Sequence, residues 1–150
     1  MNRSETRNMA YKLLYSLEIQ KPEKNEIQEQ IEIFIANNDI TENNVKDYIY
    51  DVINGIYENE DKIIPIIEKN LKDEWTIDRV SKTNLSILKL ATFEIIYSKL
   101  PYKVVINEAI ELAKRYGDDN SYFFVNGILA NIVKELKLED SAVHWNELVK

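Results

Sequence analysis

Residues 45–57 read VKDYIYDVINGIY and carry large apolar side chains at helical spacing. The apolar series continues at intervals of three and four residues, through Val45, Tyr48, Ile49, Val52, Ile53, Ile56 and Tyr57. Because an α-helix completes a turn in about 3.6 residues, side chains at this spacing lie on one face. The segment therefore predicts a helix that buries one apolar stripe against a core.

On both sides of this segment the same period predicts further helices. One is expected from about residue 3 to 20, ending at Lys21-Pro22 because a residue before proline disfavours the α conformation. Others are expected over about 27–37, 59–71, 75–99 and 103–116, and from 121 to 136. Pro65 is expected in the first turn of its helix or at a kink. Gly117 is expected to end the preceding helix as a left-handed cap.

Seven predicted helices with short connections, and no predicted strand, indicate an all-α protein. Only three glycines and three prolines occur in 150 residues, which argues against a β-sandwich or barrel with its many tight turns. The length suits one domain, and the absence of cysteine excludes a disulfide. An acidic block at residues 25–79, followed by a basic one at 80–117, suggests two packed layers of helices within that domain.

Residue types that carry catalysis are scarce. His144 is the single histidine and there is no cysteine, which excludes thiolate nucleophiles and metal sites built from several histidines. The three glycines are too dispersed to form a phosphate-binding loop. We therefore expect no metal, no cofactor and no enzymatic activity. No apolar run is long enough for a membrane span or a signal peptide, so a soluble cytoplasmic protein is expected.

The net charge of −7 is distributed unevenly. It is +2 over residues 1–24, −9 over 25–79, +3 over 80–117 and −3 over 118–150. If the two basic segments meet in the fold, they present a basic strip to phosphates. The alternative interpretation is that both are ordinary solvated faces, and charge by itself leaves both open.

The first predicted helix carries two arginines in line with its apolar stripe. At about 100° per residue, Arg3 and Arg7 fall on the face of Ala10 and Leu14. Their stems could cover the edge of the core, or the guanidinium groups could project and bind phosphates. Lys12 lies nearby on a more exposed face.

A second candidate binding element is the stretch from Asp119 to Gly127, DNSYFFVNG. Its three consecutive aromatic residues cannot all face the core, because neighbours differ by about 100° around a helix axis. At least one is expected to be exposed, where it could stack on an unpaired base. The alternative is that this ring packs on a neighbouring helix or on the C-terminal tail.

Several segments resemble the NusB family of transcription antitermination factors. The N-terminal pattern is Arg3-x-x-x-Arg7-x-x-Ala10-x-x-x-Leu14-Tyr15, and the central one is Trp75-x-x-x-Arg79 followed by Leu88-x-x-Ala91-x-x-Glu94. The most specific stretches are residues 101–114, PYKVVINEAIELAK, and residues 124–129, FVNGIL. The resemblance covers about residues 3–136.

The resemblance implies two small three-helix bundles with an added helix, packed as one NusB-like domain over residues 1–137, with 138–150 as a C-terminal tail. It also implies a bacterial, cytoplasmic, non-catalytic RNA-binding protein. Family members pair with the small-subunit ribosomal protein NusE, and the two bind the boxA element of nascent RNA. Within the transcription elongation complex they help RNA polymerase to pass terminators, chiefly on ribosomal RNA operons.

The resemblance also implies functional residues. Arg3 and Arg7 would contact RNA phosphates, with Lys12 beside them, and a second set would lie near the same RNA: Lys114, Tyr116, Asn120, Phe124 and Asn126. Lys89, Tyr102 and Lys103 would lie toward the ribosomal protein. The family often has a denser arginine cluster at the N-terminus, whereas Glu5 stands here between the two arginines. We therefore expect weak RNA binding unless a basic partner contributes.

A second interpretation stays open. The chain could be a helical scaffold for other proteins, or a homodimer, whose RNA surface is weak or buried. The acidic segment at residues 25–79 would then attract basic partners. Salt dependence separates the two interpretations, because phosphate contacts weaken steeply with salt whereas an apolar interface is nearly indifferent to it.

Overall fold

The computed structural model describes residues 1–72 and 75–136, and within them it contains helices and no strand. The described residues form seven α-helices in succession: α1 Arg3–Gln20, α2 Ile27–Asn37, α3 Asn43–Glu58, α4 Glu60–Lys69, α5 Lys82–Tyr97, α6 Tyr102–Tyr116 and α7 Ser121–Glu135. Two short 3₁₀ turns, η1 Lys24–Glu26 and η2 Ile77–Arg79, precede α2 and α5. The predicted all-α class is confirmed. The helices divide into two compact units, the first ending at Glu58 and the second beginning at Asn59.

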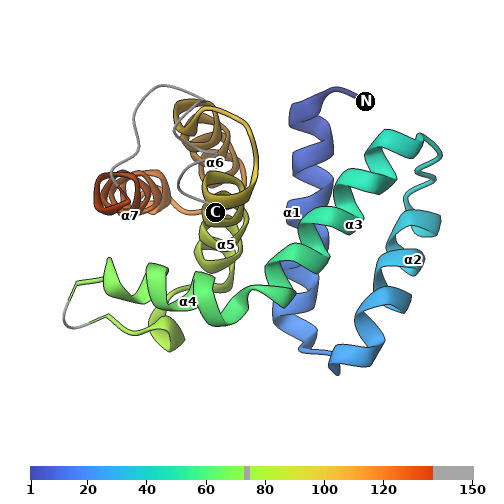
Figure 1. Cartoon of the computed structure of the whole chain (residues 1–150), viewed down its shortest axis with the longest axis horizontal. Coiled ribbons are helices and arrows are strands. Elements are labelled where there is room, and N and C mark those ends of the chain that lie inside the picture. The colour runs from blue at the N-terminus through green and yellow to red at the C-terminus, as the bar shows by residue number, and fades with distance from the viewer. Residues whose placement is uncertain (73–74, 137–150) are drawn as a thin grey trace. The chain divides into compact units, whose positions relative to one another are not determined.

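The first unit contains α1, α2 and α3, with α1 and α3 side by side (Figure 1). The apolar stripe predicted for α3 is its buried face, with Ile49, Ile53 and Ile56 fully inaccessible. On α1, Ala10 and Leu14 are also fully buried. The helical period of the sequence therefore identified the faces that form this core.

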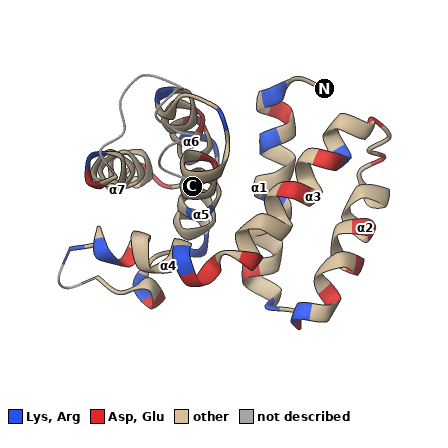
Figure 2. Cartoon of the chain, in the orientation of Figure 1, with Lys and Arg blue, Asp and Glu red and all other residues tan. Residues whose placement is uncertain are grey.

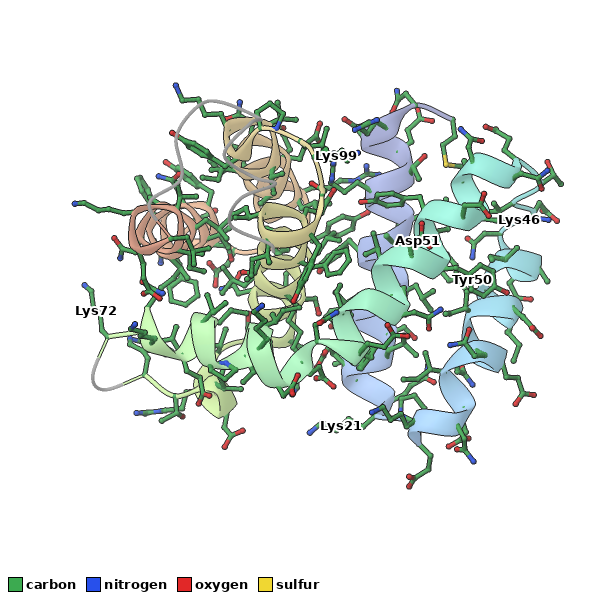
Figure 3. All side chains as sticks on the ribbon, in the orientation of Figure 1. Lys21, Lys46, Tyr50, Asp51, Lys72 and Lys99 are labelled. Carbon is green, nitrogen blue, oxygen red and sulfur yellow. The ribbon has the colours of Figure 1, made fainter. Side chains whose placement is uncertain are left out.

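Local sequence signals determine both ends of α1. The Asn2 side chain accepts a hydrogen bond from the Glu5 amide at 2.8 Å and caps the first turn. At the other end, Lys21 takes a left-handed conformation with φ 50°, just before Pro22. Figure 3 shows Lys21 at this end of the helix. The predicted bounds of residues 3 and 20 are both confirmed.

The second unit is organised around α5, which contacts α4, α6 and α7. Eleven of its sixteen residues are buried, so α5 is enclosed on nearly all sides. A helix of this kind belongs in the interior of a bundle. By contrast, α6 buries one stripe, formed by Val105, Ala109, Leu112 and Ala113. The Val104-Val105-Ile106 run is thus helical, as its spacing predicts.

The division by charge into two layers does not coincide with the compact units. The acidic block extends to residue 79, but the units divide after Glu58, so α4 belongs to the second unit. Ile63 and Ile67 of α4 are fully buried, and the helix contacts α5 and α7. Apolar burial decides where α4 packs, because exposed charges are solvated wherever the helix lies.

Pro65 lies in the second turn of its helix. It is the sixth residue of α4 and its side chain is exposed, so it is outside the first turn. A proline at this position lacks the amide that would bond to the Asp61 carbonyl. The helix forms despite this loss because Ile63 and Ile67, two positions before and after the proline, are fully buried.

Residues 137–150 lie outside the described residues. This range includes the expected C-terminal tail and His144, which sequence analysis expects on the surface. Within residues 1–72 and 75–136, no helix has both the length and the apolar character needed to cross a bilayer. The same residues contain no group of three or more metal-ligating side chains placed to hold an ion.

Candidate nucleic-acid interface

A hollow of about 330 Å³ opens on the second unit, between η2, the start of α5 and the turn before α7. Its walls combine aromatic rings, a guanidinium group and polar side chains: Trp75, Arg79, Val80, Ser81, Asn84, Asp118, Asn120, Ser121 and Phe124. These residues come from two segments about forty positions apart in the sequence. The fold of the second unit therefore creates a site that neither segment contains by itself.

Helix capping shapes one wall of the hollow. The Ser81 Oγ accepts a hydrogen bond from the Asn84 amide at 3.1 Å, which starts α5 at Lys82. Sequence analysis expects this helix to start near Trp75, and the structure corrects that expectation. The seven residues before α5 instead form an irregular segment with the η2 turn, and this segment carries Trp75 and Arg79 into the hollow.

The opposite wall is a tight turn between α6 and α7. The Asp118 Oδ1 accepts hydrogen bonds from the Asn120 amide at 2.9 Å and from the Ser121 hydroxyl at 3.3 Å. The Ser121 Oγ in turn accepts from the Asp118 amide at 3.0 Å. These bonds hold Asn120 and the first turn of α7 in a defined position beside the hollow.

Gly117 makes this turn possible, although not as a left-handed cap. Its φ is −90° and its ψ is −176°, so the backbone is extended and the prediction of a left-handed conformation is wrong. A Cβ at this position would lie 2.3 Å from the Ser121 Oγ and 2.8 Å from the Ala113 carbonyl oxygen. Close approach of the chain, and not backbone conformation, requires glycine here.

Two aromatic rings give the hollow its binding surface. The ring centroids of Trp75 and Phe124 are 6.1 Å apart with the planes tilted by 50°, and Trp75 is 45% exposed. Exposed indole and phenyl faces can stack on nucleobases, and the Arg79 guanidinium can bind phosphate or stack. The sequence resemblance includes Trp75 and Arg79, but the prediction of site residues omitted both. Their signal was an aromatic and a cation four residues apart, directly before a buried helix.

The structure brings together some of the predicted RNA-contacting residues of the second unit. Asn120 and Phe124 line the hollow, and Asn126 is exposed farther along α7. Lys114 is exposed on α6, with its Nζ 5.7 Å from the centroid of the Tyr122 ring. Tyr116 is half-buried, and the guanidinium carbon of Arg115 lies 5.3 Å from the centroid of its ring.

In the first unit, Arg3, Arg7 and Lys12 differ in exposure. Arg3 and Lys12 are exposed, whereas Arg7 is only 2% exposed. For Arg7 this burial favours the interpretation in which an arginine covers the edge of the core. For Arg3 the phosphate-binding interpretation stays open, because its side chain is accessible at the N-terminal end of α1. Figure 2 shows basic residues at that end of α1 and acidic residues along α2 and α3.

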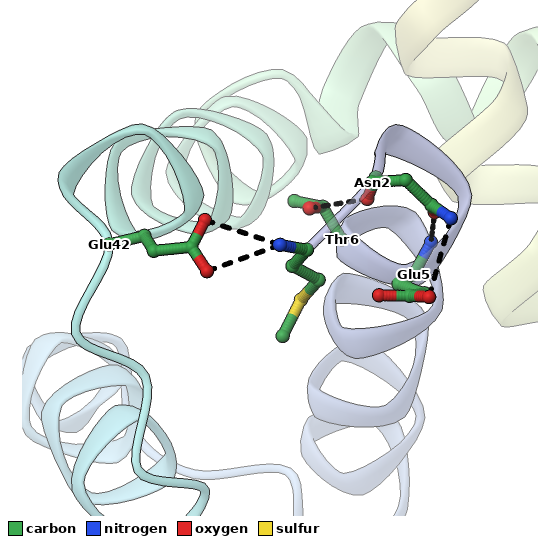
Figure 4. Close-up of polar contacts among 5 residues, drawn as sticks. Asn2, Glu5, Thr6 and Glu42 are labelled. Atoms are coloured by element: carbon green, nitrogen blue, oxygen red, sulfur yellow. Dashed lines mark hydrogen bonds and ion pairs between the residues drawn. The ribbon is translucent and has the colours of Figure 1, made fainter.

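Polar contacts hold the N-terminal end of α1 in place. The Met1 ammonium lies 3.2 Å from a Glu42 carboxylate oxygen, and the Thr6 hydroxyl donates to the Asn2 carbonyl at 2.9 Å (Figure 4). Glu5 accepts from the Asn2 side-chain amide at 3.3 Å. The Glu5 carboxylate is exposed in the first turn of α1, two positions after Arg3, so it lowers the local positive potential there.

The three residues expected to face a protein partner differ in solvent exposure. Lys89 is 3% exposed and forms an ion pair with Glu60 at 3.2 Å, which links α5 to α4. Little of its surface is available to a partner. Tyr102 is half-buried and Lys103 is exposed in the first turn of α6. Two further apolar residues, Tyr15 and Ile19, are exposed four positions apart on α1, and sequence analysis did not predict their exposure.

Within the described residues, the protein is all-helical: seven helices form two compact units, and an aromatic hollow lies beside the α6–α7 turn. The NusB family model matches residues 4–134, and the chain belongs to the NusB family. It is 45% identical over 137 residues to the transcription antitermination protein NusB of Clostridium novyi (strain NT), which covers 89% of this chain and 99% of that protein.

Solved structures agree with this assignment. NusB of T. maritima superposes with a TM-score of 0.81 at 35% identity, covering 90% of this chain and 92% of that one. A chain from the crystal structure of the antitermination factors NusB and NusE in complex with dsRNA gives a TM-score of 0.78 at 25% identity. That match covers 90% of this chain and 99% of the other.

Proposed function

We propose that this chain is a non-catalytic transcription antitermination factor of the bacterial cytoplasm. In this role it pairs with the small-subunit ribosomal protein NusE and binds boxA RNA of ribosomal RNA operons, as part of the elongation complex. Membership of the NusB family supports the proposal, as does the similarity to a NusB that is solved together with NusE and dsRNA.

The observation that carries the RNA-binding part is the aromatic hollow of the second unit. The hollow is lined by the Trp75 and Phe124 rings, the Arg79 guanidinium and the Asn120 side-chain amide. Proteins in general bind single-stranded RNA with groups of these kinds, through stacking and hydrogen bonds. In the proposal Asn126, Lys114 and Tyr116 extend this contact along α6 and α7. No redox or nucleophilic chemistry is needed for the function.

Arg3 and Lys12 supply phosphate contacts from the first unit in this proposal, while Arg7 mainly supports the helix beneath them. Their contribution is modest because Glu5 lies beside Arg3 and because the whole chain carries a net charge of −7. A basic partner would therefore supply part of the phosphate contact. Lys103 and Tyr102 are the proposed partner-facing residues, and Lys89 acts within the fold through Glu60.

The test is fluorescence anisotropy of a short labelled boxA-like RNA, with the protein alone and with the NusE-type partner, beside a scrambled RNA. We expect tighter, sequence-preferring binding when the partner is present. Arg3→Ala should weaken that binding for every sequence, because a phosphate contact carries no sequence information. Lys21→Ala is the matched control, since it removes an exposed cation at the opposite end of α1, about 27 Å away at 1.5 Å per residue.

Equal binding of boxA-like and scrambled RNA under all conditions, despite a formed heterodimer, would contradict RNA recognition. The alternative function, a helical protein scaffold or homodimer, would then be favoured. The acidic residues along α2 and α3 are the feature that supports this alternative, because they can attract basic proteins. Binding of boxA RNA by the isolated chain as tightly as by the heterodimer would instead contradict the proposed contribution of the partner.

A further inference from the structure

Phe123 is the most exposed large apolar side chain among the described residues, at 65%. It lies in the first turn of α7, one position before Phe124. Phe124 lines the hollow beside Trp75, so Phe123 lies outside it. The proposed function as stated above has no role for this exposed ring.

A second aromatic ring lies beside Phe123. The Tyr122 ring is in contact with it, with the centroids 4.1 Å apart and the planes tilted by 31°. The Lys114 ammonium lies over the Tyr122 ring, 5.7 Å from its centroid. Phe123 is therefore supported by a second ring, and a cation lies over that second ring.

The rest of this helix face is polar. The helical positions three before and three after Phe123 are Asn120 and Asn126, and four after it is Gly127; all three are exposed. An extended apolar patch would mark a protein-docking surface, and a single ring between two side-chain amides does not form such a patch. A lone exposed ring beside hydrogen-bonding amides and a cation instead matches the groups that bind a nucleobase and its phosphate.

We propose that Phe123 is a stacking site for one unpaired nucleobase of single-stranded RNA, adjacent to the hollow but distinct from it. This inference rests on the proposed RNA-binding function. The base would lie on the open face of Phe123, with its edge within reach of the Asn120 and Asn126 amides. The adjoining phosphate would lie toward Lys114 and away from Asp119, which is exposed in the turn before α7 and repels phosphate.

The test uses the full chain with its NusE-type partner and a single-stranded boxA-like RNA that carries 2-aminopurine at successive positions. We expect Phe123→Ala to weaken binding by about fivefold or more, the lower end of the range for base–aromatic stacking. One 2-aminopurine position should lose its quenching in this variant. Phe123→Trp should retain both affinity and quenching, whereas Phe123→Leu, which is apolar but not aromatic, should lose most of both.

Two controls make the result specific. Ile33→Ala removes an exposed apolar side chain from α2 and should leave RNA affinity unchanged. Binding to a fully paired duplex of the same sequence should not depend on Phe123, because paired bases are not available for stacking on a side chain. Since Phe123 is exposed, its variants should unfold at the same temperature as the parent chain.

The outcomes separate this inference from the proposed function. If the parent chain binds boxA RNA and Phe123→Ala binds equally well, the stacking site is wrong and the function stands. If Phe123→Leu matches the parent chain, the contact is merely apolar and the inference is also overturned. Loss of partner binding in Phe123→Ala without RNA would assign the ring to a protein interface. Absence of RNA binding by every form would overturn both the inference and the proposed function.

Discussion

At Gly117 the chain approaches Ser121 so closely that a single added carbon has no room. The nearest contacts of a Cβ there would be the Ser121 Oγ at 2.3 Å and its Cβ at 2.4 Å, and the Ala113 carbonyl oxygen would lie at 2.8 Å. The Ser121 hydroxyl cannot turn away without losing its hydrogen bonds to Asp118. One residue thus determines whether the α6–α7 turn can support Asn120 and the aromatic residues of α7.

Gly117→Ala should lower the free energy of unfolding by about 1–3 kcal/mol, the usual cost of overpacking. Thermal or urea unfolding followed by circular dichroism measures the change. Gly127→Ala is the matched control: it lies inside α7 with nothing within 4 Å of an added Cβ, and it should stabilise by roughly 0.5–1 kcal/mol through helix propensity. Equal effects of the two substitutions would show that crowding at Gly117 has no energetic importance.

Among the helices, α4 depends most on its neighbours. It has ten residues, too few for a stable isolated helix, and Pro65 removes one backbone hydrogen bond from its interior. Burial of Ile63 and Ile67, together with the Glu60–Lys89 ion pair, offsets these costs. The Tyr97 hydroxyl also donates to the Asn59 side chain at 3.1 Å, which ties the start of α4 to the end of α5.

Pro65→Ala should therefore stabilise the protein. The substitution restores an amide that can donate to the Asp61 carbonyl, and it removes the clash of the ring with the preceding turn. After allowing for the greater freedom of the unfolded chain, the net gain should be about 1–2 kcal/mol. Glu68→Ala, an exposed change in the same helix, should alter the melting temperature little. A lower melting temperature for Pro65→Ala would mean that α4 needs a proline-dependent bend to reach α5.

Over the whole molecule, the net charge and its distribution along the chain affect RNA binding more than any single ion pair does. The chain is acidic, yet Arg3, Lys12 and Lys114, three of the cations among the proposed RNA contacts, lie in its two basic segments. Figure 2 shows the acidic residues along α2 and α3. An acidic protein that binds RNA through such segments must rely on short-range contacts, because its long-range field repels the ligand.

The salt dependence of RNA binding tests this balance. With the partner present, the logarithm of affinity should fall linearly with the logarithm of salt concentration, and Arg3→Ala should reduce the slope by about one. Phe123→Ala should weaken binding without changing the slope, since stacking releases no counterions. The measurement is a series of anisotropy titrations at increasing salt. A slope near zero would favour the scaffold function, in which an apolar interface dominates.

Local sequence patterns predicted the all-α class, the buried faces and most helix bounds. The bounds of α1 and the stripe on α3 followed from local patterns, because helical periodicity and capping act over a few residues. The exposed aromatic expected near the start of α7 is Phe123, for the same geometric reason.

Which residues form sites depends on how the helices pack. The burial of Arg7 and Lys89, the place of α4 in the second unit and the role of Gly117 all depend on side chains distant in sequence. The hollow likewise exists because packing brings Trp75 to Phe124 across forty-nine positions. Solvent exposure and the meeting of distant groups are properties of the packed chain, so no local period of the sequence encodes them.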